Sequence, residues 1–228
     1  MADVTLTYKG NTIAEMSDTG TKTLKTAGKY CEGDIGVSYV KPSSGGTSDD
    51  LAIKMITGEG DITELPSGIT KIRGFAFSDC DNLKLTSLPE GITSIGIGAF
   101  NSCGNLALTS LPSGITEIEN STFNLCTNLS LTSLPSGINI IRDSAFSNCT
   151  NLALTYLPDG VTSIRQFAFA YCTGLTTITF KGTPSSIASN AFNGCTNLTT
   201  INVPWAEGAV ANAPWGATNA TINYNYTE

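Results

Sequence analysis

The chain has 228 residues, of which 40 % are hydrophobic and only 14 % charged, and its net charge is −7. This composition is typical of an ordered, turn-rich protein, and an acidic chain whose only arginines are Arg73, Arg142 and Arg165 is a poor match for nucleic acid. There is no histidine, which excludes Ser-His-Asp and Cys-His nucleophile systems and His-ligated zinc.

Residues 1–41 predict a small all-β module. The segment Val4–Tyr8 alternates between apolar and polar residues, and residues 12–16 are expected to pair back with it as a hairpin. Residues 22–25 and 35–40 predict two further strands. No basic segment followed by an apolar core opens the chain, so we expect no signal peptide, and no apolar stretch is long enough to predict a membrane span.

A linker and a cap are expected to follow this module. Residues 42–50 read PSSGGTSDD, which predicts a flexible linker. Residues 51–64 are expected to cap the repeat array that follows, because the end of a stacked array otherwise exposes its core and an unpaired strand edge.

Residues 65–202 repeat with a period of 23 residues, which predicts a solenoid of six stacked repeats. Each repeat carries a cysteine, with a phenylalanine three residues before it. The cysteines are Cys80, Cys103, Cys126, Cys149, Cys172 and Cys195, and the phenylalanines are Phe77, Phe100, Phe123, Phe146, Phe169 and Phe192. Stacking aligns like residues, so we predict that both sets form buried structural ladders beside four further apolar columns.

Three segments of each repeat have their own predicted structure. A Pro-x-Gly sequence predicts a tight turn, and the segment 76–80 and its copies predict one short helical turn. The run Leu-x-Leu-Thr-Ser-Leu, with Tyr156 in place of serine in its last copy, predicts the strand of a parallel sheet, at 83–88, 106–111, 129–134 and 152–157. Ile178 and Ile201 stand where earlier repeats have threonine, so the inward-facing set of residues is expected to change there.

Residues 203–228 predict a C-terminal cap. Trp205 and Trp215 are expected to form a lid over the last repeat, with a final strand in 221–226. An exposed aromatic binding patch is the alternative for the two tryptophans.

The spacing of the cysteines favours packing over chemistry. A metal site needs thiolates two to four residues apart, and parallel stacking points neighbouring side chains in the same direction rather than at each other. Acidic residues such as Glu117 and Glu119 could form a carboxylate pair for glycoside hydrolysis, but the surface of a coil offers no cleft for it. We therefore predict no metal, no cofactor and no enzymatic activity.

The repeat L-P-x-x-I-T-x-I-x-x-x-A-F-x-x-C-x-x-L resembles the BspA-like leucine-rich repeat family over about residues 65–202. The resemblance implies a leucine-rich-repeat solenoid of the kind found in bacterial surface and adhesion proteins, which bind host or matrix proteins. It carries over no binding residues by position. The N-terminal run GTKTLKTAGKYCEGDIGVSYV resembles segments of phage and prophage structural proteins.

Candidate binding residues are expected at positions where the residue type differs between repeats, while the buried columns stay constant. Arginines and aromatic residues gather in the fourth and fifth repeats, and such residues are favoured at interface hot spots. The predicted patch consists of Arg142, Tyr156, Arg165, Phe167 and Tyr171. The alternative is that these positions vary on a solvent-exposed face without any binding role.

These observations predict a non-enzymatic binding or structural module. We expect a phage or prophage virion component, in which residues 1–41 dock to a virion partner and the solenoid recognises a protein or glycan, because virion proteins need no signal peptide. A BspA-like bacterial surface adhesin is the first alternative, with a location at the cell surface instead of the virion. A carbohydrate-active enzyme is the second.

Overall fold

The computed structural model describes residues 83–227 without a break, residues 63, 65, 69–72 and 74–80 before them, and the strands at 4–8, 11–16 and 51–53. Strands β1 (Val4–Tyr8) and β2 (Asn11–Met16) pair antiparallel, with one register shift between Leu6 and Thr7. This confirms the predicted hairpin. The two other strands expected in residues 1–41, Cys31 and the predicted linker lie outside the described residues.

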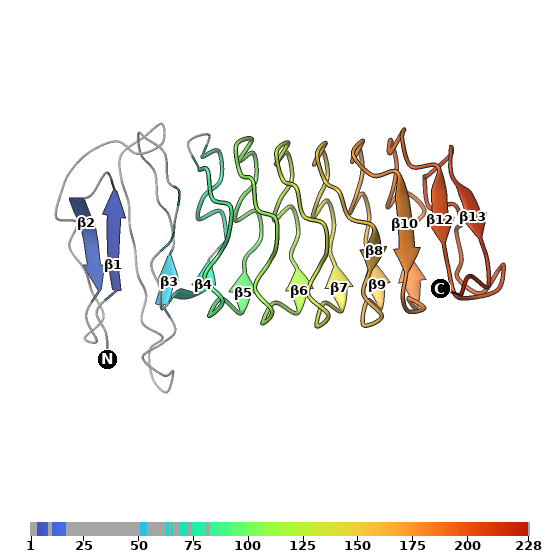
Figure 1. The fold of residues 1–228 in the computed structure, drawn as a ribbon, viewed down its shortest axis with the longest axis horizontal. Coiled ribbons are helices and arrows are strands. Elements are labelled where there is room, and N and C mark those ends of the chain that lie inside the picture. The colour runs from blue at the N-terminus through green and yellow to red at the C-terminus, as the bar shows by residue number, and fades with distance from the viewer. Residues whose placement is uncertain are drawn as a thin grey trace.

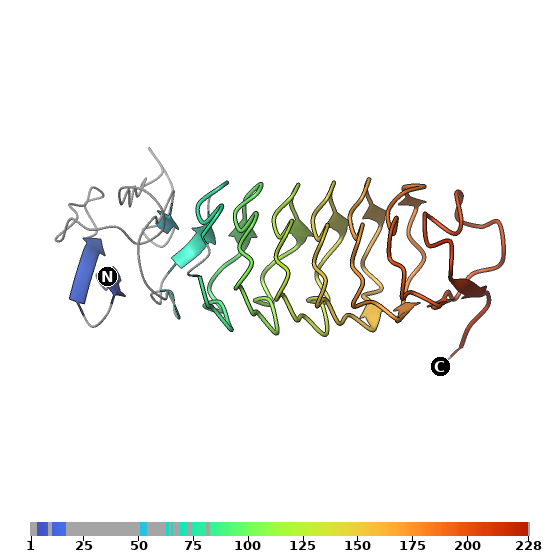
Figure 2. The same cartoon turned by 90° about the horizontal axis from the view of Figure 1, so that it is seen from above.

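The repeats form a single row of coils along the long axis of the molecule, as Figures 1 and 2 show from two sides. All strand pairs in this row are parallel. In most of them the paired residues are one repeat apart, as in Ile118, Ile141 and Ile164. The 23-residue period therefore corresponds to one turn of the solenoid, which confirms the predicted fold class.

Among the described residues, three parallel sheets line the solenoid. The strands β3 (Leu51–Ile53), β4 (Ile69–Ile72) and β5 (Ser94–Ile95) form the first. The strands β6 (Glu117–Ile118), β7 (Ile140–Ile141), β9 (Ser163–Ile164) and β11 (Ser186–Ile187) form the second. The strands β8 (Tyr156–Leu157), β10 (Thr177–Phe180), β12 (Thr200–Asn202) and β13 (Thr221–Asn223) form the third. We call the side of β4, β5, β6, β7, β9 and β11 the isoleucine face, and the side of the third sheet the leucine face.

The prediction of a strand in each Leu-x-Leu-Thr-Ser-Leu run is wrong for the first three repeats. Leu83, Leu85 and Leu88 are buried, so the inward spacing is two residues and then three, which breaks the strict alternation of a strand. These runs are linked by isolated backbone hydrogen bonds instead of a continuous ladder. One example is the bond from the Ala107 amide to the Leu85 carbonyl oxygen at 3.1 Å. From β10 onward Ile178 and Phe180 are the buried residues, and the strand becomes regular. This confirms the predicted change of the inward set.

The helical turn predicted at 76–80 is also wrong, and no helix occurs among the described residues. Phe75 and Asp79 have positive φ angles of 56° and 59°, and a residue in this left-handed region ends a right-handed helix. The amides of Phe75, Phe77 and Asp79 instead donate to carbonyls of the next coil at 2.8–2.9 Å. We call the surface formed by this segment and its copies (74–80, 97–103, 120–126, 143–149, 166–172 and 189–195) the turn face.

The predicted phenylalanine and cysteine ladders are confirmed. The six rings stack with centroids 5.1–5.5 Å apart and planes within 9° of parallel. The six cysteines are free thiols, and none is more than 3 % exposed. From Cys103 onward, each Sγ donates to the carbonyl oxygen of the phenylalanine 26 residues earlier, at 2.8–3.0 Å. The cysteines are therefore hydrogen-bond donors as well as small apolar residues.

A seventh, shorter coil closes the C-terminal end. Its strand β13 pairs with β12, which confirms a last strand in this region. Trp205 and Trp215 are 6 % and 0 % exposed and pack on Phe180, with ring centroids 5.2 Å and 6.0 Å away. The tryptophans thus form the predicted lid, and the alternative of an exposed aromatic patch is wrong. No membrane-spanning helix is found among the described residues.

Candidate binding surfaces

Two columns of the turn face, which run from Phe75 to Asn190 and from Asp79 to Gly194 in steps of 23 residues, consist almost entirely of residues with positive φ. Most of their members are small, as serine, asparagine and glycine tolerate this conformation. The exceptions are Phe75, Leu125, Phe167 and Tyr171, which are 57 %, 43 %, 38 % and 50 % exposed. The fifth repeat differs from the others because both columns carry an aromatic residue there, on one turn. Phe167 and Tyr171 therefore form an exposed apolar pair, which we call the aromatic turn.

The backbone under the aromatic turn is held by the next coil. The amides of Phe169 and Tyr171 each donate to a carbonyl of the next coil at 2.8 Å. The ring of Tyr171 lies against Gly194 so closely that a Cβ there would overlap it. The pair is thus presented by a fixed backbone, which lowers the entropy lost when a partner binds.

Arg142 and Arg165 occupy the same position in successive repeats, directly after β7 and β9. Arg142 is held by Glu117 at 2.9 Å and Glu119 at 3.3 Å. Its hydrogen bond to Glu117 and the charges of both carboxylates raise the pKa of Arg142. Partial burial, and then the charge of Glu117, raises the pKa of Glu119. For the exposed Arg165 the structure gives no ion pair with any described residue, so its guanidinium is the one better placed to meet a partner.

Tyr156 belongs to a different surface from the other four predicted residues. It lies in β8 on the leucine face, whereas Arg142 and Arg165 follow strands of the isoleucine face and lead into the turn face. The structure therefore brings Arg165 together with Phe167 and Tyr171 along one coil, with Arg142 in the preceding coil, and places Tyr156 elsewhere.

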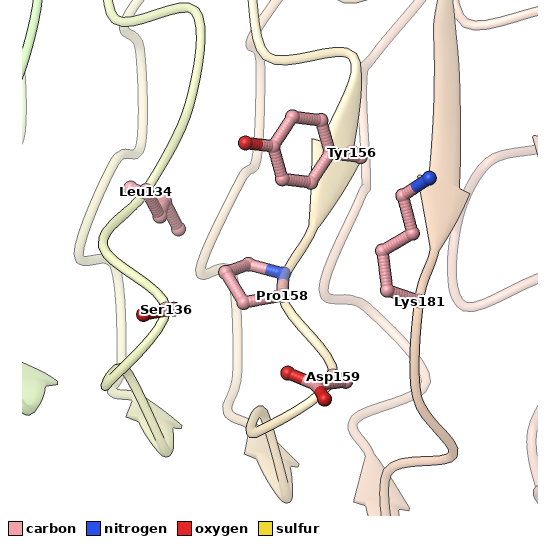
Figure 3. Close-up of a pocket in the computed structure, with 6 residues that line it drawn as sticks. All are labelled: Leu134, Ser136, Tyr156, Pro158, Asp159 and Lys181. Carbon is pink, nitrogen blue, oxygen red and sulfur yellow. The ribbon is translucent and has the colours of Figure 1, made fainter.

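A groove of about 340 Å³ surrounds Tyr156 (Figure 3). It is lined by Leu134, Ser136, Tyr156, Pro158, Asp159 and Lys181. Leu134 and Pro158 are buried, Tyr156 is half-buried, and the three polar residues are exposed. The Lys181 Nζ lies 5.6 Å from the centroid of the Tyr156 ring, a distance typical of a cation–π contact.

Asp159 and Lys181 are absent from the patch predicted by sequence. The signal that could have found them is the period itself. Thr179 is the partner of Tyr156 one repeat on, and Lys181 follows it by two residues.

The ladder cysteines are unsuited to metal binding or nucleophilic chemistry. Burial raises the pKa of Cys126 to about 12 and that of Cys195 to about 11, so both stay protonated at neutral pH. Among the described residues, no group of His, Cys, Asp or Glu side chains is arranged to hold a metal ion.

Solved structures of bacterial leucine-rich repeat proteins are similar to this chain. A Bacteroides ovatus leucine-rich repeat protein is 23 % identical with a TM-score of 0.60, over 73 % of this chain and 45 % of that one. The Treponema protein described as T. pallidum Leucine Rich Repeat protein is 27 % identical with a TM-score of 0.57, over 73 % of this chain and 81 % of that one. A leucine rich cell surface protein from Faecalibacterium prausnitzii is 33 % identical with a TM-score of 0.53, over 65 % of this chain and 39 % of that one.

This chain thus spans less than half of the Bacteroides and Faecalibacterium proteins. A search of curated proteins finds no match. The sequence pattern described as BspA type Leucine rich repeat region matches residues 61–172 and 141–207, which together cover most of the chain. These matches agree with the ladders and parallel coils described above: the chain belongs to the BspA-type leucine-rich repeat family.

Proposed function

We propose that this chain is a non-enzymatic recognition module of a bacterial cell surface, and that it docks a protein partner through the aromatic turn. Family membership supports a binding or structural role, and one of the similar solved structures is a cell surface protein. The aromatic turn would supply the apolar centre of the interface. Arg165 would add a cation beside it, and Arg142, already paired with two carboxylates, would lie at its rim.

The observation that carries the proposal is the pair of exposed aromatic side chains on residues with φ of 55° and 58°. A bulky residue is uncommon in this left-handed region, and the equivalent residues of the preceding repeat are Ser144 and Asn148. Serine or asparagine would adopt the same backbone conformation at less cost, so this conformation does not require the rings of Phe167 and Tyr171. Rigid, exposed aromatic residues beside an arginine have the composition of an interface hot spot.

The virion role expected from residues 1–41 stays a prediction. Within that segment the structure describes the β1–β2 hairpin, and the similar solved structures are proteins of bacteria. Genes for tail or capsid proteins beside this gene would favour the virion role over the cell-surface role.

The test is binding of the purified chain to a panel of immobilised extracellular-matrix and host-cell surface proteins. The double variant F167S/Y171S removes both rings and installs the residue found at equivalent positions, Ser144 and Ser102. We expect it to keep its stability and to lose at least about tenfold in affinity for the partner that the wild type binds, the effect of about 1.4 kcal/mol.

The matched control is Phe75→Ser, which removes an exposed phenylalanine from the same column at the other end of the array. It should bind like the wild type. Equal binding by F167S/Y171S and wild type, or an equal loss in Phe75→Ser, would contradict the assignment of the aromatic turn.

A further inference from the structure

We propose that the groove around Tyr156 is a second, independent site, which binds a neutral β-1,4-linked glycan lying along the solenoid axis. The proposal does not depend on the aromatic turn or on its partner.

The groove exists because Tyr156 interrupts a column of small residues. The equivalent residues are Ser133 in the preceding repeat and Thr179 in the next. The tyrosine ring is therefore larger than its neighbours in the column, and the buried Leu134 and Pro158 form the apolar part of the groove lining. Figure 3 shows the hydroxyl of Tyr156 directed away from Lys181, toward the coil that carries Leu134.

The polar residues of the groove recur along the axis. Ser136 and Asp159 hold the same position in successive Pro-x-Gly turns, and Lys181 follows from the next coil. Three successive coils thus each contribute one polar side chain to the lining of the groove. An elongated ligand whose own repeat matches the coil spacing would meet these side chains in turn.

The chemistry of the lining fits a sugar. A pyranose ring has an apolar face of C–H groups, which packs on an aromatic ring, and a rim of hydroxyls that both donate and accept hydrogen bonds. The carboxylate of Asp159 accepts only, the ammonium of Lys181 donates only, and the Ser136 hydroxyl does both. A cavity of about 340 Å³ lies at the small end of ligand sites, as expected for a short stretch of a glycan chain.

Spacing and charge narrow the class of glycan. Adjacent coils are 5.1–5.5 Å apart by their stacked phenylalanine rings. A β-1,4-linked chain is extended and advances by about the same distance per sugar, whereas an α-1,4-linked chain curves away from a straight row. The net charge of −7 disfavours an acidic polysaccharide, so the ligand is neutral.

The test is calorimetric titration of the full chain with cellotetraose and with the tetramer of β-1,4-linked N-acetylglucosamine. We expect at least one to bind, with affinity rising from monosaccharide to trisaccharide and then levelling off. Maltotetraose, the α-1,4-linked tetramer, should bind at least about tenfold more weakly. Tyr156→Ser, which installs the residue of the preceding repeat, should weaken binding by about tenfold.

Two further variants make the result decisive. Asp159→Asn leaves the groove in place and should also weaken binding by about tenfold, because it removes a charged acceptor. Phe75→Ser removes an exposed aromatic residue on the turn face and should leave glycan binding unchanged. The proposal is overturned if neither β-1,4-linked tetramer binds at millimolar concentration, if maltotetraose binds equally well, or if Tyr156→Ser and Asp159→Asn bind like the wild type. Preferential binding of an extended peptide to the same groove would overturn it as well.

Discussion

From Cys103 onward, each cysteine of the ladder connects two coils. The carbonyl oxygen of Phe77 accepts hydrogen bonds from the amide of Cys80 at 3.2 Å and from the Sγ of Cys103 at 2.8 Å. The thiol thus satisfies a second lone pair on a buried carbonyl while its sulfur fills apolar space. The burial of these residues could be predicted from their period, but the acceptor could not, because it lies on the preceding coil.

The raised pKa values of the cysteines predict a loss of stability at alkaline pH. In the unfolded chain a thiol ionises near its ordinary value of 9.0, whereas the folded protein holds Cys126 protonated up to about 12. Stability is therefore fully present below pH 9.0 and falls as pH rises toward 12. One pH unit above 9.0, each such thiol should lower the free energy of unfolding by about 1.4 kcal/mol.

The comparison that isolates this effect is wild type against Cys126→Ala in urea unfolding over that pH range. The variant has one thiol fewer, so its free energy of unfolding should fall less steeply with pH, although it starts lower. Identical pH dependence in the two proteins would show that burial of Cys126 does not control the loss.

The two tryptophans of the cap differ in one hydrogen bond. The Nε1 of Trp215 donates to the Ala211 carbonyl at 2.7 Å, whereas the buried Nε1 of Trp205 has no hydrogen-bond partner among the described residues. Trp215→Phe removes this hydrogen bond and leaves the Ala211 carbonyl without its donor. Trp205→Phe removes a donor that is already unsatisfied. Trp205→Phe should therefore be the less destabilising by about 1–3 kcal/mol in urea unfolding. Equal losses would indicate that Trp205 has a partner in solution.

At the scale of elements, the inward-facing columns could be predicted and the backbone between them could not. A 23-residue period identifies which residues stack. It does not show which stacked residues pair through backbone hydrogen bonds to form a strand. The alternation of exposed and buried residues in Glu117–Ile118 and its copies is as short as that in the leucine runs. Backbone geometry therefore decides which of the two segments forms a strand. The turn face is the clearest case, because its left-handed residues are held by hydrogen bonds to the next coil.

The turn after Phe180 depends on a glycine for its close approach to the preceding coil. A Cβ on Gly182 would overlap the carbonyl oxygen of Asp159, which is backbone and cannot move aside. Gly182→Ala should therefore lower the free energy of unfolding by about 1–3 kcal/mol, a typical cost of overpacking. Gly104→Ala is the matched control, since its Cβ would lie an ordinary 3.7 Å from the nearest atom, the Thr127 Oγ1. It should change stability by less than about 0.5 kcal/mol, and a similar loss in both variants would refute the role of the close approach.

At the scale of the molecule, stability is shared between neighbouring coils. Phe146 stacks on Phe123 at 5.5 Å and on Phe169 at 5.4 Å, so Phe146→Leu removes two ring contacts and should cost about 1–3 kcal/mol. Phe192, at the end of the ladder, stacks on Phe169, and Phe192→Leu should cost about half as much. Urea unfolding of both variants checks the ratio, and a larger loss at Phe192 would contradict it.

The residues of the proposed binding surfaces can be identified from the sequence only in part. Varying positions within a constant repeat identify Arg165, Phe167 and Tyr171, because the period alone separates core from surface. The same rule identifies Tyr156, but column position does not reveal that this residue lies on the leucine face, away from the other four. The groove beside it depends on Asp159 and Lys181, whose proximity arises from coil stacking.

The hydrogen bonds between coils run in opposite directions on two sides of the solenoid. On the turn face the Phe77 amide points toward the C-terminal end, to Ala99, whereas on the isoleucine face the Thr93 amide points toward the N-terminal end, to Thr70. The peptide dipoles of the two sides therefore oppose each other along the axis, unlike those of an α-helix. A bare end would present donors on one side and acceptors on the other, in a pattern complementary only to the opposite end of a second molecule. Uncapped copies would consequently be able to stack head to tail into polar fibres, and the buried tryptophans of the seventh coil close the core at the end where such stacking would begin.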